Sequence, residues 1–267
     1  MDTLTQARKL IKESKRTQNP YLDLGRCGIT KLEELPELFE CVHLETLILS
    51  SEWWDRKGQR VFSNNNGKDN IISSISAEIS KLKNLKNLVI SGNFNALWSI
   101  TDIGFLENLT ALQSLDLSSN NLSDIRFLEN LSDLQSLYLS SNNISDIRFL
   151  EKFVGLQSLD LSYNDLSDIS FLENLTSLQS LHLSSNTISD IHVLENFTCL
   201  RSLDLSSNNI SDIHFIENLT CLHSLDLSNN KISDIHFLKD LTCLQSLDLS
   251  SNNISDVSFL ENLTCLQ

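Results

Sequence analysis

A segment of 22 residues repeats without interruption through the C-terminal part of the chain. The copy from Leu112 to Asp133 reads LQSLDLSSNNLSDIRFLENLSD, and an asparagine marks the same position in every copy. These asparagines are Asn120, Asn142, Asn164, Asn186, Asn208, Asn230 and Asn252. A fixed period of this length is typical of solenoids, in which each copy is one structural unit that packs on its neighbours. The period therefore outweighs the estimate of one or two ordinary domains that a length of 267 residues would give.

The apolar positions within one copy predict a short strand followed by an inward-facing coil. Leu115 and Leu117 alternate with Asp116, which is the pattern of a strand with one buried face. Burial stabilises each apolar side chain by roughly 1.5–3 kcal/mol, whereas ordering the backbone costs about 1–2 kcal/mol per residue. A single repeat is therefore unstable, and only stacking gives a folded array. Ten such strands are predicted, beginning at Leu22, Leu47, Leu88, Leu115, Leu137, Leu159, Leu181, Leu203, Leu225 and Leu247. The recurrent asparagine is interpreted as a ladder that satisfies backbone groups where the chain leaves the strand.

The pattern L-x-x-L-x-L-x-x-N-x-[LI]-S-D-I-x-x-L-x-x-L resembles that of the leucine-rich repeat family, in its short bacterial class. The resemblance implies an α/β leucine-rich repeat solenoid. This is a curved right-handed coil with a parallel β-sheet on the concave face and short 3-10 or irregular segments on the convex face. Residues 1–20 are predicted to form a capping helix, whose alternative role is a basic surface for an acidic partner. Residues 21–267 are predicted to form about ten repeats, with insertions near 51–70 and 93–100.

Two branches of this family resemble different parts of the chain. The repeat N-x-I-S-D-I-x-x-L-E-N-L-T-x-L-Q-S-L over residues 101–267 resembles that of internalins, which are bacterial surface adhesins. Internalins usually have a proline at the position of Phe127, and they carry an export signal. The opening segment ARKLIKESKRTQNPYLDLGRCGITKLEELPE is more similar to bacterial intracellular repeat proteins. These include Roco-type proteins, in which a leucine-rich array precedes a GTPase module.

The charge is distributed unevenly, and it argues against two classes of partner. Residues 1–100 contain 14 Lys and Arg against 12 Asp and Glu, whereas residues 101–267 contain 6 against 23. A solenoid this acidic is repelled by phosphate backbones and by anionic membrane surfaces. Neither nucleic acid nor a membrane is therefore expected as a partner.

The N-terminal segment and the cysteines favour a cytoplasmic protein. MDTLTQARKLIKESKRTQ lacks the apolar run of a signal peptide. Cys199, Cys221, Cys243 and Cys265 occupy one phase of the repeat, where other copies carry Ala111 or Gly155. This variation indicates a tolerant surface position, with free thiols in a reducing compartment, and a metal site there is the minor alternative. No cofactor is expected, and no catalytic residue stands out, because each Asp, Ser and His lies in a repeated column.

The two insertions contain the strongest candidates for partner contacts. Both leave the coil just after a strand, in consecutive repeats, so we expect them side by side at one edge of the concave face. They carry all three tryptophans of the chain and two phenylalanines, namely Trp53, Trp54, Phe62, Phe94 and Trp98. Aromatic side chains on loops of a rigid scaffold are typical of binding hot spots. The alternative is that they pack on one another as a small core that lets an insertion fold.

The concave face of the regular repeats is predicted to be acidic and serine-rich. Its outward strand positions include Tyr138, Asp160, His182, Asp204, Asp226 and Asp248. A row of aspartates fits a basic segment of a partner, and the alternative is a soluble residue copied by duplication. His182 lies between two aspartates and is a candidate pH-sensitive contact. A second histidine column, His192, His214 and His236, is interpreted as solvated surface rather than as a metal site.

These observations predict a non-enzymatic protein-interaction or sensor scaffold, the N-terminal part of a larger intracellular bacterial protein. The alternatives are an internalin-like surface adhesin and the regulatory repeat domain of a Roco-type GTPase. The last copy stops at Gln267 with no polar capping repeat, which leaves Leu260, Leu263 and Leu266 facing water. A continuation of the same chain is therefore expected to cover this end of the core.

Overall fold

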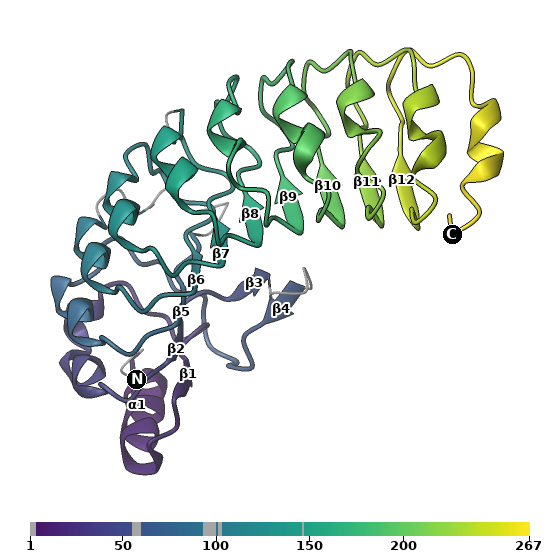
Figure 1. Ribbon diagram of the computed structural model, residues 1–267. Helices are drawn as coiled ribbons and strands as arrows, with labels where there is room; N and C mark the ends of the chain where they lie inside the picture. The colour runs from purple at the N-terminus through teal and green to yellow at the C-terminus, as the bar shows by residue number, and fades with distance from the viewer. Residues whose placement is uncertain (1–3, 55–59, 93–99, 101–102, 146) are drawn as a thin grey trace. The chain divides into compact units, whose positions relative to one another are not determined.

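The computed structural model describes residues 4–54, 60–92, 100, 103–145 and 147–267, with Trp54 and Phe259 described by their backbones. The chain divides into two compact units, Met1–Asn142 and Asn143–Gln267. Both units are built from short parallel strands that alternate with 3-10 segments, as Figure 1 shows. Within the described residues, no helix has the length and apolar character needed to cross a membrane.

The first unit begins with helix α1 (Thr5–Thr17), which is followed by five parallel strands. These strands are β1 (Tyr21–Asp23), β2 (Thr46–Ile48), β5 (Asn87–Val89), β6 (Ser114–Asp116) and β7 (Ser136–Tyr138), paired in that order. The antiparallel hairpin β3 (Glu52–Trp54) and β4 (Arg60–Phe62) lies outside this sheet. The 3-10 segments are η1 (Leu32–Glu34), η2 (Pro36–Glu40), η3 (Ala77–Lys81), η4 (Gly104–Asn108) and η5 (Arg126–Asn130).

The second unit is regular, and its strands pair in register at the spacing of the repeat. They are β8 (Ser158–Asp160), β9 (Ser180–His182), β10 (Ser202–Asp204), β11 (Ser224–Asp226) and β12 (Ser246–Asp248). The 3-10 segments are η6 (Arg148–Lys152), η7 (Ser170–Leu172), η8 (His192–Asn196), η9 (His214–Ile216), η10 (His236–Asp240) and η11 (Ser258–Asn262). The leucine-rich repeat fold predicted from the sequence is therefore confirmed.

The repeated leucines and isoleucines form the core, and the asparagine ladder connects the repeats. Leu203 and Leu205 are buried, as are their equivalents in the other repeats except the last, where Leu247 and Leu249 are partly exposed. Asn208 accepts the amide of Ile188 at 3.0 Å and donates to the carbonyl oxygens of Leu183 and Leu205 at 3.0 and 3.1 Å. The ladder interpretation is confirmed, because each such side chain satisfies backbone groups of its own repeat and of the preceding one.

The residue before each ladder asparagine from Asn120 to Asn252 has a left-handed backbone. Ser207 has a φ of 54°, and Ser119, Ser141, Tyr163, Ser185, Asn229 and Ser251 have φ values between 54° and 56°. In this conformation the Ser207 amide donates to the Ser228 carbonyl of the next repeat at 2.8 Å. The turn gains an inter-repeat hydrogen bond, although a side chain with a Cβ is strained in this region.

Helix α1 packs on the first repeat through its apolar face. Ala7 and Ile11 are buried. Lys15 forms an ion pair of 2.6 Å with Glu40 in η2, and Arg16 pairs with Glu13 of the helix itself. Part of the basic face of the helix is therefore paired with carboxylates of the protein itself.

The prediction for the leucines near Gln267 was wrong in one respect. Leu260 and Leu266 are partly exposed, but Leu263 is only 3 % exposed. Segment η11 ends at Asn262, and the Leu263 amide donates to the Leu260 carbonyl at 3.0 Å. The tightening of the chain after the 3-10 segment directs Leu263 inward.

Candidate protein-binding site

The insertion after β2 leaves the coil between the strand and the ladder asparagine of the same repeat. In a regular repeat the ladder asparagine follows the central leucine by five residues, as in Leu203 and Asn208, whereas Asn70 follows Leu47 by 23. Asn70 accepts the amides of Cys27 and Ile29 at 3.0 and 2.9 Å. It donates to the Leu24 and Leu49 carbonyls at 2.8 and 2.7 Å. Asn70 is therefore the ladder asparagine of the second repeat, and the coil closes normally around the excursion.

The sequence contained a signal for this role. Residues 70–75 read NIISSI, which matches N-x-[LI]-S-D-I except for Ser74 in place of aspartate. The break in the repeat pattern predicts that the insertion ends at Asn70, but it does not predict a role for the Asn70 side chain.

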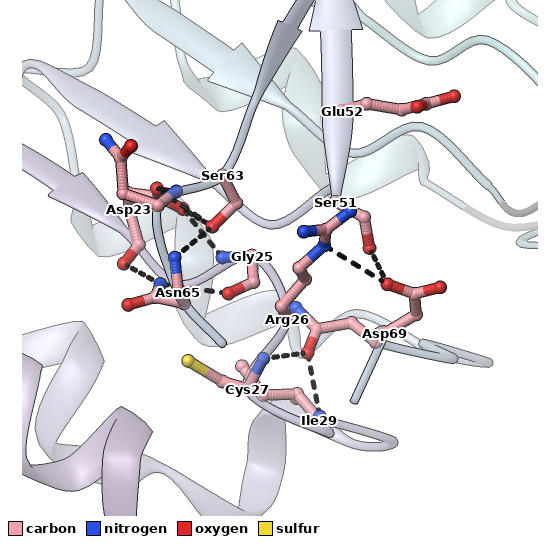
Figure 2. Close-up of polar contacts among 12 residues, drawn as sticks. Asp23, Gly25, Arg26, Cys27, Ile29, Ser51, Glu52, Ser63, Asn65 and Asp69 are labelled. Atoms are coloured by element: carbon pink, nitrogen blue, oxygen red, sulfur yellow. Dashed lines mark hydrogen bonds and ion pairs between the residues drawn. The ribbon is translucent and has the colours of Figure 1, made fainter. Parts of the chain in front are cut away.

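The base of the insertion is held against the turn of the first repeat by Asp23 (Figure 2). The Asp23 carboxylate accepts the Ser63 hydroxyl at 2.9 Å and the amides of Gly25 and Asn64 at 2.8 and 3.3 Å. The Asn65 side-chain amide donates to the Asp23 and Gly25 carbonyls at 3.0 and 2.9 Å. Hydrogen bonds to a charged acceptor are stronger than neutral ones, so this network fixes the direction in which the hairpin leaves the coil.

Two glycines permit this close packing. A Cβ on Gly25 would overlap the Ser50 carbonyl oxygen and the Ser63 side chain, and a Cβ on Gly67 would overlap the Arg26 carbonyl oxygen. At both positions the obstacle includes backbone, which moves less readily than a flexible side chain. The insertion is therefore fitted to this turn of the first repeat.

The hairpin that the insertion carries has one face of linked polar and aromatic side chains. Arg60 donates to both carboxylate oxygens of Glu52 at 2.6 Å, and its guanidinium lies 5.1 Å from the Phe62 ring centroid. Both contacts are made by the same guanidinium nitrogen, Nη2, and they link the two strands of the hairpin by an ion pair. Trp53 and Val61 pair across the hairpin and belong to its other face.

A pocket of about 410 Å³ lies between the hairpin and the exits of the neighbouring strands. The hairpin contributes Glu52, Trp53 and Arg60, and the first two repeats contribute Arg26 and Asp69. The strand exits contribute a group of serines, including Ser50, Ser91, Ser118 and Ser140. Ser91 also donates from its hydroxyl to the Glu52 carbonyl at 3.3 Å, so the start of the second insertion adjoins the hairpin. The pocket is thus polar, with charges of both signs.

The aromatic residues predicted to contact a partner differ in their exposure to solvent. Trp53 is half-buried and lines the pocket, and Phe62 is 48 % exposed. The backbone of Trp54 pairs with Arg60. Phe94 and Trp98 lie outside the described residues. Tyr138, on β7 of the same unit, is only 7 % exposed, so a partner reaches little of its ring.

The remaining predicted contacts form one row on the second unit. Asp160, His182, Asp204, Asp226 and Asp248 are register partners on successive strands. Each aspartate also has a local role, because its Oδ1 accepts the amide of the serine two residues on. Hydrogen bonds from the Ser250 hydroxyl and amide hold the pKa of Asp248 below its usual value. The aspartates therefore support the turn at the strand exit, a role that the sequence analysis missed. His182 instead contacts the Ser180 and Ser202 hydroxyls at 3.3 and 3.4 Å.

The other two columns singled out in the sequence are on the surface. His192, His214 and His236 each contact the aspartate two residues before them, at 2.6 to 2.9 Å. The thiols of Cys199, Cys221, Cys243 and Cys265 are free and exposed, whereas Cys27 and Cys41 are buried. Among the described residues, no group of three or more His, Cys, Asp or Glu is placed to hold a metal ion.

Comparisons with known proteins agree with this architecture. The family described as leucine-rich repeats (2 copies) matches residues 110–152, 154–196 and 198–240, and the family described as leucine-rich repeat matches residues 240–258. An internalin (inlF) from Listeria monocytogenes is similar at 31 % identity and a TM-score of 0.73, over 98 % of this chain and 80 % of its own. Internalin C2 from the same organism is also 31 % identical, with a TM-score of 0.65, over 76 % of this chain and 84 % of its own.

A more distant structure shares the fold. The leucine-rich repeat ectodomain of the Arabidopsis thaliana receptor kinase GASSHO1/SCHENGEN3, solved with Casparian strip integrity factor 2, is 23 % identical, with a TM-score of 0.64. The similarity covers 87 % of this chain and 30 % of that one. None of the curated protein sequences matches the chain.

The repeat pattern, the ladder and these matches together define a leucine-rich repeat solenoid. The chain belongs to the leucine-rich repeat family and is of the internalin type.

Proposed function

We propose that this protein is a non-enzymatic scaffold that binds a protein partner. The insertion after β2, which carries the hairpin, is the proposed anchor. One observation carries the proposal, namely a hairpin with an exposed Phe62 whose base is hydrogen-bonded to Asp23 of the first repeat. Trp53 and Phe62 are thereby presented on a fixed support, which lowers the entropy lost on binding. The plant ectodomain that shares this fold was solved in complex with Casparian strip integrity factor 2, and this supports a binding role for the scaffold.

The row of Asp160, His182, Asp204, Asp226 and Asp248 is proposed as a second contact surface, on the second unit. Residues 101–267 carry 6 Lys and Arg against 23 Asp and Glu, so this surface suits a basic segment of the partner. Binding through it should weaken as ionic strength rises from 50 to 500 mM, because salt screens exposed charges. An affinity that does not change with salt would remove this row from the contact surface.

The test of the anchor is affinity capture from native lysate with the 267-residue chain and two variants. One variant is Trp53→Ala with Phe62→Ala, and the matched control is Tyr163→Ser, which removes an exposed aromatic ring outside the hairpin. The expected result is a protein retained by the parent chain and by the control, and lost by the double variant. Circular dichroism checks that all three fold. A partner that the double variant retains would show that the hairpin is not the anchor.

Location separates two candidate roles. The resemblance of the opening segment to Roco-type repeat proteins supports our proposal of an intracellular protein, the N-terminal part of a larger chain. The 31 % identity to an internalin over 98 % of the chain favours an internalin-like surface adhesin as the second candidate. Protease treatment of intact producing cells, followed by immunoblotting, distinguishes them, because only a surface protein is digested. A phosphate-binding G-x-x-x-x-G-K-[ST] motif downstream in the genomic reading frame would indicate the regulatory domain of a GTPase.

A further inference from the structure

Four free cysteines of the second unit form a column of exposed thiols. They occupy the same position in four successive repeats, 22 residues apart. This thiol column consists of Cys199, Cys221, Cys243 and Cys265. An exposed thiol contributes nothing to the packing of the core, so what distinguishes it from a serine is its reactivity and its affinity for metals. The question is therefore what neighbouring thiols of the column can do together.

The backbone holds these four positions in register on both sides of the cysteine. Cys199 is the third residue of a turn in which the Leu200 amide donates to the Phe197 carbonyl at 3.0 Å. The other three turns contain the same bond at 3.0 to 3.2 Å. Two residues after the cysteine, adjacent repeats are bonded directly, because the His223 amide donates to the Arg201 carbonyl at 2.8 Å. This bond recurs in the next two repeats at 2.8 and 3.1 Å, so the thiols extend from equivalent turns in the same direction.

The spacing of the repeats decides which chemistry two neighbouring thiols can share. The strands that follow the turns pair in register, and paired strands lie about 4.8 Å apart. Parallel side chains on adjacent repeats keep their Cβ atoms at about this distance, whereas a disulfide brings them to about 3.8 Å. Two metal–sulfur bonds of about 2.3 Å together span about 4.6 Å. A metal ion between two sulfurs therefore fits the column better than an S–S bond does.

The ligands select the ion. Soft thiolates favour Cu(I), Zn²⁺ and iron–sulfur clusters over hard cations. Zn²⁺ is almost always held by four ligands, and in the part of the chain that the structure describes no three His, Cys, Asp or Glu residues are placed around one metal position. Cu(I) needs only two thiolates, one on each side of the ion. Residues 101–267 carry 6 Lys and Arg against 23 Asp and Glu, so the surrounding field also attracts a cation.

We propose that adjacent cysteines of the thiol column bind Cu(I) as a two-coordinate bridge. Each of the two thiols releases its proton to solvent, two copper–sulfur bonds form, and no electron is transferred. Cys199 with Cys221 and Cys243 with Cys265 make two separate pairs, so the chain binds two ions. This site goes beyond the scaffold function and does not depend on it, because the hairpin belongs to the first unit.

The test is a competition for Cu(I) in anaerobic buffer that contains ascorbate. The full chain is titrated into the coloured Cu(I) complex of bicinchoninate, and the loss of colour measures the copper that passes to the protein. The parent chain should take up two ions. The two buried thiols, Cys27 and Cys41, are present in every variant and serve as a constant background.

Two double variants separate adjacency from the number of thiols. Cys199→Ser with Cys221→Ser leaves Cys243 and Cys265 in adjacent repeats. Cys199→Ser with Cys243→Ser leaves the same number of thiols, but two repeats apart. The first variant should keep one bound ion, and the second should bind copper about a hundredfold or more weakly, because no second thiol is within reach of the ion. All three cysteines are exposed, and circular dichroism checks that both variants fold.

Three results would overturn the inference. The first is failure of the parent chain to take up Cu(I) from bicinchoninate. The second is equal copper binding by the two variants, which would mean that each thiol acts alone. The third is loss of thiols in adjacent pairs, and not in separated ones, when metal-free protein is treated with oxidised glutathione, because the column would then form disulfides. The lysate experiment with Trp53 and Phe62 tests the scaffold function separately.

Discussion

The first and second units show what this coil tolerates and what it requires. In the second unit, every repeat places its ladder asparagine five residues after the central leucine, as in Leu203 and Asn208. In the first unit, 18 additional residues separate Leu47 from Asn70, yet Asn70 bonds to the same kinds of backbone groups. The repeat is thus defined by the hydrogen bonds that the asparagine makes, and not by its distance along the chain.

The largest expected effect tests whether Asn70 and Asn208 contribute equally to the stability of the protein. Asn70→Ala and Asn208→Ala each leave several buried backbone groups unpaired, so each should lower the free energy of unfolding by about 3 kcal/mol. Urea denaturation followed by circular dichroism measures both. A loss for Asn70→Ala below about a third of that for Asn208→Ala would show that the insertion, and not Asn70, closes its own repeat.

Gly25 in the first unit and Gly155 in the second unit differ in the space available for a Cβ atom. Gly25→Ala should destabilise the protein by about 2 kcal/mol, because the new Cβ meets the Ser50 backbone and the Ser63 side chain. Gly155→Ala, in the second unit, meets nothing within 4 Å and should change stability by about 0.5 kcal/mol or less. Thermal melts of the two variants give the result. Similar melting temperatures would mean that the insertion shifts readily away from the first repeat.

The aspartates at the strand exits should differ in their contributions to stability. Asp23→Ala removes the acceptor of bonds from Gly25, Ser63 and Asn64, and we expect a loss of about 2 kcal/mol. Asp204→Ala removes the bonds from the Ser206 amide and hydroxyl alone and should cost about 1 kcal/mol. Limited proteolysis should cut Asp23→Ala within residues 51–70 faster than Asp204→Ala. Equal cutting would contradict the anchoring role of Asp23.

Stability at high pH should depend on a thiol of the first unit. Burial, aided by the Asp23 carboxylate, raises the pKa of the Cys27 thiol from 9.0 to about 11. Because the folded-state pKa is the higher one, this contribution is complete below pH 9 and is lost as the pH rises toward 11. We expect a loss of about 2 kcal/mol over that range, and its absence in Cys27→Ser. Denaturation curves at pH 8 and pH 10.5 test this, with Cys199→Ser as the control for an exposed thiol.

The smallest effect concerns the left-handed turns. Ser207→Gly should stabilise the second unit by about 0.5 kcal/mol, because glycine adopts a φ of 54° without a Cβ penalty. The neighbouring Ser206→Gly lacks this benefit and loses the hydroxyl bond to Asp204, so it should be destabilising. Differential scanning calorimetry resolves the two. If Ser206→Gly were also stabilising, the benefit of glycine would not be specific to the residue with the left-handed backbone.

The sequence predicted the fold well, because its information lies in the period. Leu115 and Leu117, repeated every 22 residues, leave few alternatives to a stacked coil with parallel strands. The position of the insertion after Leu47–Leu49 was also visible as a break in that period. These features depend on burial, which a pattern of apolar residues reports directly.

The site was less predictable, because its properties depend on hydrogen bonds between distant segments. Asp23 and Ser63 are 40 residues apart, and nothing in their local sequence marks them as partners. The aspartates from Asp160 to Asp248 were interpreted as a partner surface, and their bonds to the amides two residues on became visible only with the turn geometry. Ser118, which lines the pocket, occurs in a motif shared by several repeats, so only its surroundings distinguish it.

The site between β2 and Asn70, where the insertion leaves and rejoins the coil, can also be used in protein engineering. Both ends of the excursion are fixed by the coil, through the β2 pairing on one side and the Asn70 bonds on the other. A foreign hairpin placed between Ser51 and Asp69 would therefore be displayed without altering the repeats that carry it. The same phase recurs between Ser206 and Asn208 and in the other regular repeats. The regular repeats therefore provide several equivalent sites for grafted binding loops. Loops grafted into neighbouring repeats would be separated by the spacing of adjacent strands, about 4.8 Å.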